Sequence, residues 1–191
     1  ETLHITPEDI GHKKIILYAP TWRDNQHDSA DGYSYQLGMD FARLRQALGE
    51  DCIILFRAHY LVANQFDFAA YEGFVWDASQ YPDINELYVV SDLLITDYSS
   101  VFFDYANLKR PILFYMYDLA AYRDDIRGFY LDLSELPGPI VETEEALIQA
   151  IPQALEGDAY DEKYQRFHAR FNALDDGHAS ERVVKRLLET K

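Results

Sequence analysis

Short apolar runs alternate with amphipathic segments along most of this chain. Each run is too short for a helix and is typical of a strand that is buried on both faces. The five runs are residues 13–18, 52–56, 74–76, 93–95 and 112–115. Between them, residues 40–48 and 84–90 carry apolar side chains at helical spacing. This alternation predicts an α/β fold, in which a Rossmann-like parallel sheet is flanked by crossover helices.

The last third of the chain is predicted to be mainly helical. Its three expected helices are residues 143–155, 161–171 and 179–188. Pro7 and Gly11 interrupt regular structure near the start, so residues 1–12 are predicted to be a linker or approach segment. We expect a single domain over residues 13–191, with a polar, mobile surface loop over residues 24–38.

Composition limits the partners of this chain. The 191 residues carry 17 basic and 33 acidic side chains, which gives a formal net charge of −16 at pH 7. Such a charge argues against a nucleic-acid groove and against docking on anionic lipid through this segment. Any bound phosphate must then be held by local hydrogen-bond donors.

The single cysteine, Cys52, lies in a predicted strand, so we expect a reduced thiol in the core of a cytosolic protein. No stretch has the length of a transmembrane helix, and we expect no signal peptide. The first residue is Glu1 rather than Met. We therefore expect a segment of a longer protein.

The turn after the fourth apolar run is the first candidate for an anion site. Thr96, Asp97, Ser99 and Ser100 favour turns and helix N-caps, and apolar residues follow them from Val101 onward. A helix beginning there would direct backbone N–H groups and two hydroxyls at the carboxyl edge of the sheet, where phosphate binds. In the alternative interpretation, these polar residues only cap the helix.

Two further loops are expected at the same edge. If the strands, numbered in chain order, are arranged 3-2-1-4-5, ligands bind between the carboxyl ends of strands one and four. Arg23 follows the first strand, and Arg57 and His59 follow the second. These side chains would then meet Ser99 and Ser100 around a pyrophosphate, which guanidinium groups and a helix N-terminus can hold.

His59 is a candidate general acid, general base or phosphate ligand, because imidazole changes charge near neutral pH. The alternative is that His59 is structural and that the two arginines are surface ion-pair residues. The sequence has no Cys/His metal-ligand spacing, no Walker loop and no dinucleotide fingerprint. We therefore expect no bound metal or cofactor.

Long stretches of the chain carry a more specific pattern. They are ILYAPTWRD (residues 16–24), FRAHYLV (56–62), the segment from SDLLITDYSS to YLDL (91–133), PGPIV (137–141) and DDGHAS (175–180). In these stretches the chain resembles the CDP-glycerol glycerophosphotransferase family, the teichoic-acid primases and polymerases of bacterial cell-wall synthesis. The resemblance implies a GT-B architecture of two Rossmann-like halves, of which this chain is the C-terminal, donor-nucleotide half.

The resemblance also implies a reaction and a set of site residues. A polyol phosphate, usually glycerol phosphate, would pass from a CDP-activated donor to the hydroxyl of a growing chain, with release of CMP and without a metal. His59 matches the family histidine that acts at the donor phosphates, although Tyr60 follows it where many relatives have proline. The expected donor-binding residues are Arg23, Arg57, Thr96, Asp97, Ser99, Ser100, Pro139, Glu142 and Glu145. The last three lie where GT-B proteins often bind ribose and base.

Two alternatives to this function are also consistent with the sequence. One is a transferase for CDP-ribitol or another sugar phosphate, and the other is an isolated nucleotide-binding module without turnover. The resemblance implies a lipid-linked polymer acceptor, bound through an N-terminal half that these residues do not include. It also implies a cytoplasmic protein held peripherally at the inner face of the cell membrane, with the membrane contact outside this segment.

Overall fold

The computed structural model describes residues 3–21, 27–28, 32–33, 38–59, 67–123, 129 and 131–189. Arg23 and Tyr60 lie outside the described residues, so the expectations for them stay predictions. In the segment that was expected to be a loop, β2 (His27–Asp28) and β3 (Gly32–Tyr33) pair as a short antiparallel sheet. The expectation of a loop without secondary structure is therefore wrong for these four residues.

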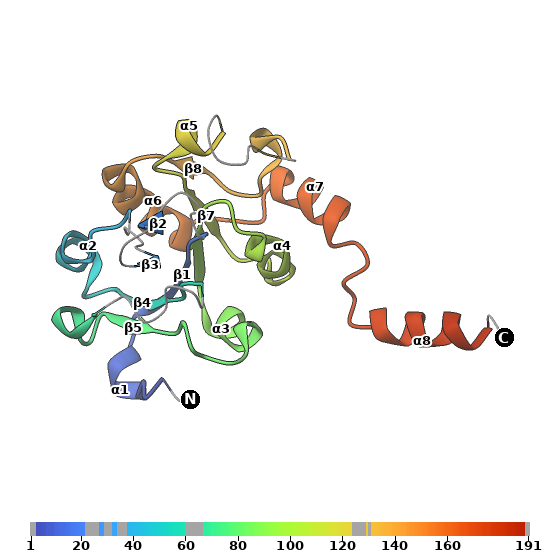
Figure 1. The fold of residues 1–191 in the computed structure, drawn as a ribbon, viewed down its shortest axis with the longest axis horizontal. Helices are drawn as coiled ribbons and strands as arrows, with labels where there is room; N and C mark the ends of the chain where they lie inside the picture. The colour runs from blue at the N-terminus through green and yellow to red at the C-terminus, as the bar shows by residue number, and fades with distance from the viewer. Residues whose placement is uncertain are drawn as a thin grey trace.

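A six-stranded parallel sheet forms the centre of the molecule (Figure 1). Its order is β5-β4-β1-β6-β7-β8, with every neighbouring pair parallel. The strands are β1 (Lys14–Ala19), β4 (Cys52–Phe56), β5 (Val75–Asp77), β6 (Leu93–Thr96), β7 (Ile112–Tyr115) and β8 (Ile140–Val141). The expected 3-2-1-4-5 order is confirmed, and β8 adds a sixth strand beside β7.

Two hydrophobic cores lie on opposite faces of this sheet. One core packs α2 (Phe41–Leu48) and α6 (Glu144–Glu156) against side chains such as Ile16 and Ile54. The other packs α3 (Ile84–Val90), α4 (Val101–Tyr105) and α7 (Glu162–Phe171) against Leu17, Leu55 and Leu94. Successive residues of β1 and β4 thus enter alternate cores. This explains why their sequences are continuously apolar.

The helices begin where polar side chains can accept their free N–H groups. Asp40, Asp83, Thr143 and Asp161 are the N-caps of α2, α3, α6 and α7, and each accepts at least one backbone N–H bond. The predicted helices at these places are confirmed to within one or two residues. The apolar segment after Ser100 is shorter as an α-helix than the pattern suggests, because α4 continues as the 3₁₀ helix η3 (Ala106–Leu108).

Short elements and the two ends of the chain complete the fold. The shorter elements are α1 (Pro7–Ile10), η2 (Ala69–Tyr71), α5 (Leu119–Ala121) and η5 (Leu133–Glu135). The last helix, α8 (Ala179–Glu189), extends away from the body of the molecule and has no buried residue (Figure 1). No helix in the described part of the chain has both the length and the apolarity needed to cross a bilayer.

Candidate functional site at the carboxyl edge of the sheet

Loops from four strands enclose a cavity at the carboxyl edge of the sheet. Its volume is about 470 Å³, and residues that follow β1, β4, β5 and β6 line it. The lining residues with polar side chains are Thr21, Arg57, His59, Ser79 and Ser99. The cavity therefore joins the RAH segment to the turn before α4, as the expected strand order requires.

Thr96 and Asp97 hold the ends of β1 and β6 together. The Thr96 hydroxyl donates to the carbonyl oxygen of Ala19 (2.7 Å), and Thr96 has no exposed surface. Asp97 Oδ1 accepts from the backbone N–H of Thr21 (2.8 Å) and from that of Tyr98 (2.6 Å). Both side chains therefore shape the backbone around the cavity. A direct contact of either with a donor stays a prediction.

Ser99 and Ser100 precede α4, but they contribute little to capping it. Ser100 is at the N-cap position, and its side chain makes no capping hydrogen bond. Ser99 Oγ accepts from Val101 N at 3.5 Å, a long distance for such a bond. Ser99 lines the carboxyl-edge cavity. This geometry favours the anion-binding interpretation over the capping interpretation for the Ser99 hydroxyl, whereas Ser100 lines a neighbouring cavity and its contact with an anion stays a prediction.

Arg57 has a structural role that the sequence did not indicate. Its Nη1 donates to the carbonyl oxygens of Ala78 (2.9 Å) and Tyr81 (2.7 Å). Burial lowers the pKa of this guanidinium, while the nearby Tyr88 and Asp83 side chains act in the opposite direction. Arg57 also lines the carboxyl-edge cavity.

His59 also lines the cavity, and its side chain is exposed. It follows two residues that are fixed by the sheet. Arg57 N donates to Tyr18 O (2.9 Å), and Ala58 is buried. His59 is thus an accessible imidazole on an anchored backbone, as a group that acts on a bound ligand must be.

Three of the expected nucleotide-binding residues do not join this arrangement. Pro139 is an exposed residue immediately before β8, and its carbonyl accepts from Phe114 N of β7 (3.0 Å). Glu145 forms an ion pair with Arg43 (2.5 Å), and Glu142 is exposed beyond β8. None of them is among the described residues that line the carboxyl-edge cavity. The expectation that these three residues contact the ribose and base of the donor stays a prediction.

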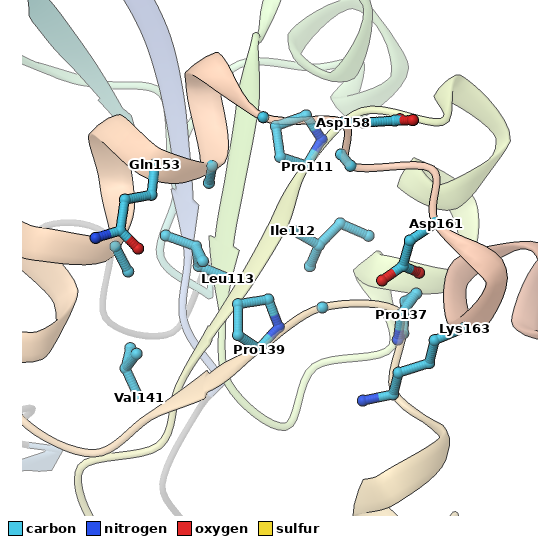
Figure 2. A pocket seen from close by; sticks show the side chains of 15 residues that line it. Pro111, Ile112, Leu113, Pro137, Pro139, Val141, Gln153, Asp158, Asp161 and Lys163 are labelled. Carbon is cyan, nitrogen blue, oxygen red and sulfur yellow. The ribbon is translucent and has the colours of Figure 1, made fainter.

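Pro139 instead lines a second cavity of about 560 Å³ (Figure 2). Figure 2 shows Pro111 and Pro139 around it, with Gln153 from α6 and Lys163 from α7 at its margin. This cavity is larger than the carboxyl-edge cavity. Its described lining includes no arginine and no histidine, and no helix that begins directly after a buried strand. The groups that bind phosphate are therefore found at the smaller, carboxyl-edge cavity, which we take as the candidate phosphate site.

Sequence reasoning missed the contribution of the loop between β5 and α3. Ser79 and Ile84 line the carboxyl-edge cavity beside Arg57 and His59. A signal was present, because a loop that follows a parallel strand opens at the same edge as the other such loops. Within the described residues, no group of three or more His, Cys, Asp or Glu side chains is placed to hold a metal ion.

Comparison with solved structures defines the class of the fold. The structure superposes on that of the wall teichoic acid polymerase TagF with a TM-score of 0.84 and 40% identity, covering 98% of this chain and 45% of that one. A histidine variant of TagF soaked with CDPG gives a TM-score of 0.78. A putative UDP-N-acetylglucosamine 2-epimerase from Listeria monocytogenes shares the fold alone (TM-score 0.52, 19% identity). The chain is one Rossmann-like half of a GT-B type architecture.

Sequence comparison gives the family. The model of the family CDP-Glycerol:Poly(glycerophosphate) glycerophosphotransferase matches residues 5–189, and the chain belongs to this family. A teichoic acid poly(glycerol phosphate) polymerase of Bacillus subtilis is 51% identical over 94% of this chain and 24% of its own length. A teichoic acid glycerol-phosphate transferase of Staphylococcus aureus is 48% identical over 93% of this chain and 46% of its own length. The chain thus spans 24% and 46% of the length of these two relatives.

Proposed function

We propose that the protein containing this chain transfers glycerol phosphate from CDP-glycerol to a hydroxyl of a growing teichoic-acid-like polymer and releases CMP. This chain supplies the donor site. The observation that carries the proposal is the convergence of Arg57, His59 and Ser99 on one cavity at the carboxyl edge of the sheet. These residues supply the donors that a pyrophosphate needs, in a chain whose net charge of −16 offers no general attraction for anions.

In this mechanism an acceptor hydroxyl attacks the β-phosphorus of the donor in line. A bond forms between the hydroxyl oxygen and phosphorus, and the bond between phosphorus and the oxygen of CMP breaks. The hydroxyl proton passes to water, and CMP leaves with the electron pair of the broken bond. Arg57 and the N–H groups before α4 stabilise the charge that grows on CMP, because they are fixed before the reaction. His59 acts at the donor phosphates, where a ring N–H of its imidazole donates to a phosphate oxygen.

Relatives that act on glycerol phosphate support CDP-glycerol as the donor. Two of them are 51% and 48% identical to this chain, whereas a poly(ribitol-phosphate) polymerase of Bacillus spizizenii is 40% identical. CDP-ribitol is therefore the second candidate donor. We also propose a lipid-linked acceptor, held by a part of the protein outside this chain, and a peripheral position at the cytoplasmic face of the membrane.

Calorimetric titration of the full-length protein with CDP-glycerol, CDP-ribitol and UDP-glucose tests the donor. We expect tighter binding of CDP-glycerol than of either alternative, unchanged by EDTA, and release of CMP once acceptor is added. Preference for CDP-ribitol would replace the proposed polyol. Binding of CDP-glycerol without any release of CMP in the presence of acceptor would indicate a nucleotide-binding module without turnover.

A further inference from the structure

At the end of the hydrogen-bond ladder between β4 and β5, two side chains replace a backbone hydrogen bond. Ala78 N donates to Phe56 O (2.7 Å), which is a regular bond of the parallel ladder. The next regular bond would join Ala58 N to the carbonyl of Ala78. Instead, Ala58 N donates to the hydroxyl of Ser79 (3.0 Å). The Ala78 carbonyl accepts from the Arg57 side chain (2.9 Å).

These side chains extend the contact between two loops beyond the last backbone pair. Ser79 is 7% exposed and Ala58 is 6% exposed, so the bond between them is shielded from water. Ser79 is itself oriented, because its N–H donates to Asp77 Oδ1 (2.8 Å). The Ser79 hydroxyl thus satisfies a buried amide that would otherwise lack an acceptor once the strand has ended.

We propose that Ser79 is a positioning residue for His59, an inference that rests on the proposed function. The Ser79 hydroxyl binds the amide of the residue immediately before His59, and the Arg57 side chain ties the same segment to the Ala78 and Tyr81 carbonyls. Together they fix the backbone from which the imidazole enters the cavity. Such placement matters, because a displacement of about 1 Å can reduce a rate about a hundredfold.

The test is a set of serine variants in the full-length enzyme. Ser79→Ala removes the acceptor of the Ala58 amide, and we expect kcat with CDP-glycerol to fall at least about tenfold, while the Kd of CDP changes less than about threefold. Exchange of the Ala58 amide hydrogen should become faster. Ser79→Thr keeps a hydroxyl and should restore most of the lost kcat.

Ser91→Ala is the matched control. Ser91 is also buried, and it is the C-cap of α3, where its hydroxyl donates to Leu87 O (2.5 Å). It precedes β6, so it lies at the edge of the sheet away from His59. We expect this variant to lower stability without changing kcat. An equal loss of kcat in Ser91→Ala, or a loss in Ser79→Ala that Ser79→Thr fails to restore, would contradict the positioning role.

Two measurements separate this inference from the proposed function. If the wild-type enzyme turns over CDP-glycerol but Ser79→Ala keeps full kcat, only the inference fails. If the wild type does not use CDP-glycerol, the proposed function fails, and amide exchange at Ala58 still reports whether Ser79 holds that segment. Unchanged exchange in Ser79→Ala would overturn the inference in either case.

Discussion

Asp97 Oδ1 lies 2.8 Å from the backbone nitrogen of Thr21 and accepts its hydrogen bond. The two residues follow β6 and β1, which are neighbours in the sheet. The same carboxylate oxygen accepts from Tyr98 N (2.6 Å), and Asp97 is 2% exposed. One buried carboxylate thus fixes the two loops that border the candidate phosphate site.

Replacing Asp97 should affect both stability and donor binding. In Asp97→Ala the amides of Thr21 and Tyr98 lose this acceptor, and we expect the free energy of unfolding to fall by about 1–3 kcal/mol. Asp97→Asn keeps an acceptor oxygen, so its free energy of unfolding should fall by less than that of Asp97→Ala. Urea denaturation measures the stability and calorimetry with CDP measures the affinity. Asp132→Ala, which removes an exposed cap that accepts from Ser134 N, is the control and should leave the affinity unchanged.

His59→Ala should abolish transfer and leave the fold intact. His59 is exposed in the cavity, so its removal costs little packing. We expect the rate of CMP release by the full-length enzyme to fall by about 10²–10⁴-fold, with the thermal unfolding temperature unchanged. His12→Ala, at an exposed turn before β1, is the control. Near-normal turnover of His59→Ala would remove this residue from the mechanism.

The double substitution Ser99→Ala and Ser100→Ala distinguishes anion binding from capping. We expect binding of CDP to weaken by about 1–3 kcal/mol if two phosphate hydrogen bonds are lost, with little change in stability. Thr143→Ala provides the opposite pattern, since the Thr143 hydroxyl caps α6 by accepting from Ala146 N (3.2 Å). That variant should lose about 1 kcal/mol of stability and no affinity. Unchanged affinity of the double variant would support the capping interpretation.

The protein should lose stability at alkaline pH. Burial, with the nearby Asp51 and Asp92 carboxylates, raises the pKa of the Cys52 thiol from 9.0 to about 11. Burial, with Glu144, raises the pKa of Tyr115 from 10.0 to about 12. Because the folded pKa values are the higher ones, the unfolded chain releases these protons first. The stabilising contribution is complete below about pH 9 and declines as the pH rises above it.

Urea denaturation at several pH values between about 8 and 11 measures this decline. Cys52→Ala is expected to lower stability at every pH, because Cys52 is buried in the core. It should also make the slope above about pH 9 shallower. An unchanged slope in this variant would exclude the thiol as a source of the alkaline instability.

Gly138→Ala should disrupt the packing between β7 and the turn before β8. A Cβ at this position would lie 1.9 Å from the carbonyl oxygen of Ile112. Proline on both sides restricts any backbone adjustment. We expect a loss of stability greater than about 3 kcal/mol, above the usual range for overpacking. Gly177→Ala, at φ +80° with no atom nearby, should lose only about 1–2 kcal/mol.

Thermal unfolding of the two glycine variants compares these losses. A small effect of Gly138→Ala would mean that the turn can move away from Ile112. Donor binding by any folded fraction should match that of the wild type, since Gly138 lines the cavity of Figure 2 rather than the carboxyl-edge cavity.

The presence of a parallel sheet, and the edge of the sheet at which the site lies, could both be predicted from local pattern, whereas the order of the strands was assumed. Apolar runs such as 52–56 are buried on both faces, and burial of this kind restricts them to the interior of a parallel sheet. His59 and Ser99 follow such strands directly, so their positions at the carboxyl edge were determined once the strand order was known. The residues that cap the helices could also be predicted locally, because an N-cap is recognised from its own type and the few residues after it.

Only the tertiary structure decided what each polar side chain does there. Arg57 was expected at the phosphate, and its Nη1 donates to two carbonyls of the next loop. Ser79 was not singled out from the sequence, and its hydroxyl accepts from the amide of Ala58, the residue before His59. Pro139 belongs to a recognisable motif, yet it lies just before β8, and its carbonyl bonds to Phe114 N of β7. These assignments depend on contacts between residues about 20 or more positions apart. Strand periodicity specifies which face a side chain takes, but not the partner that reaches it across a loop.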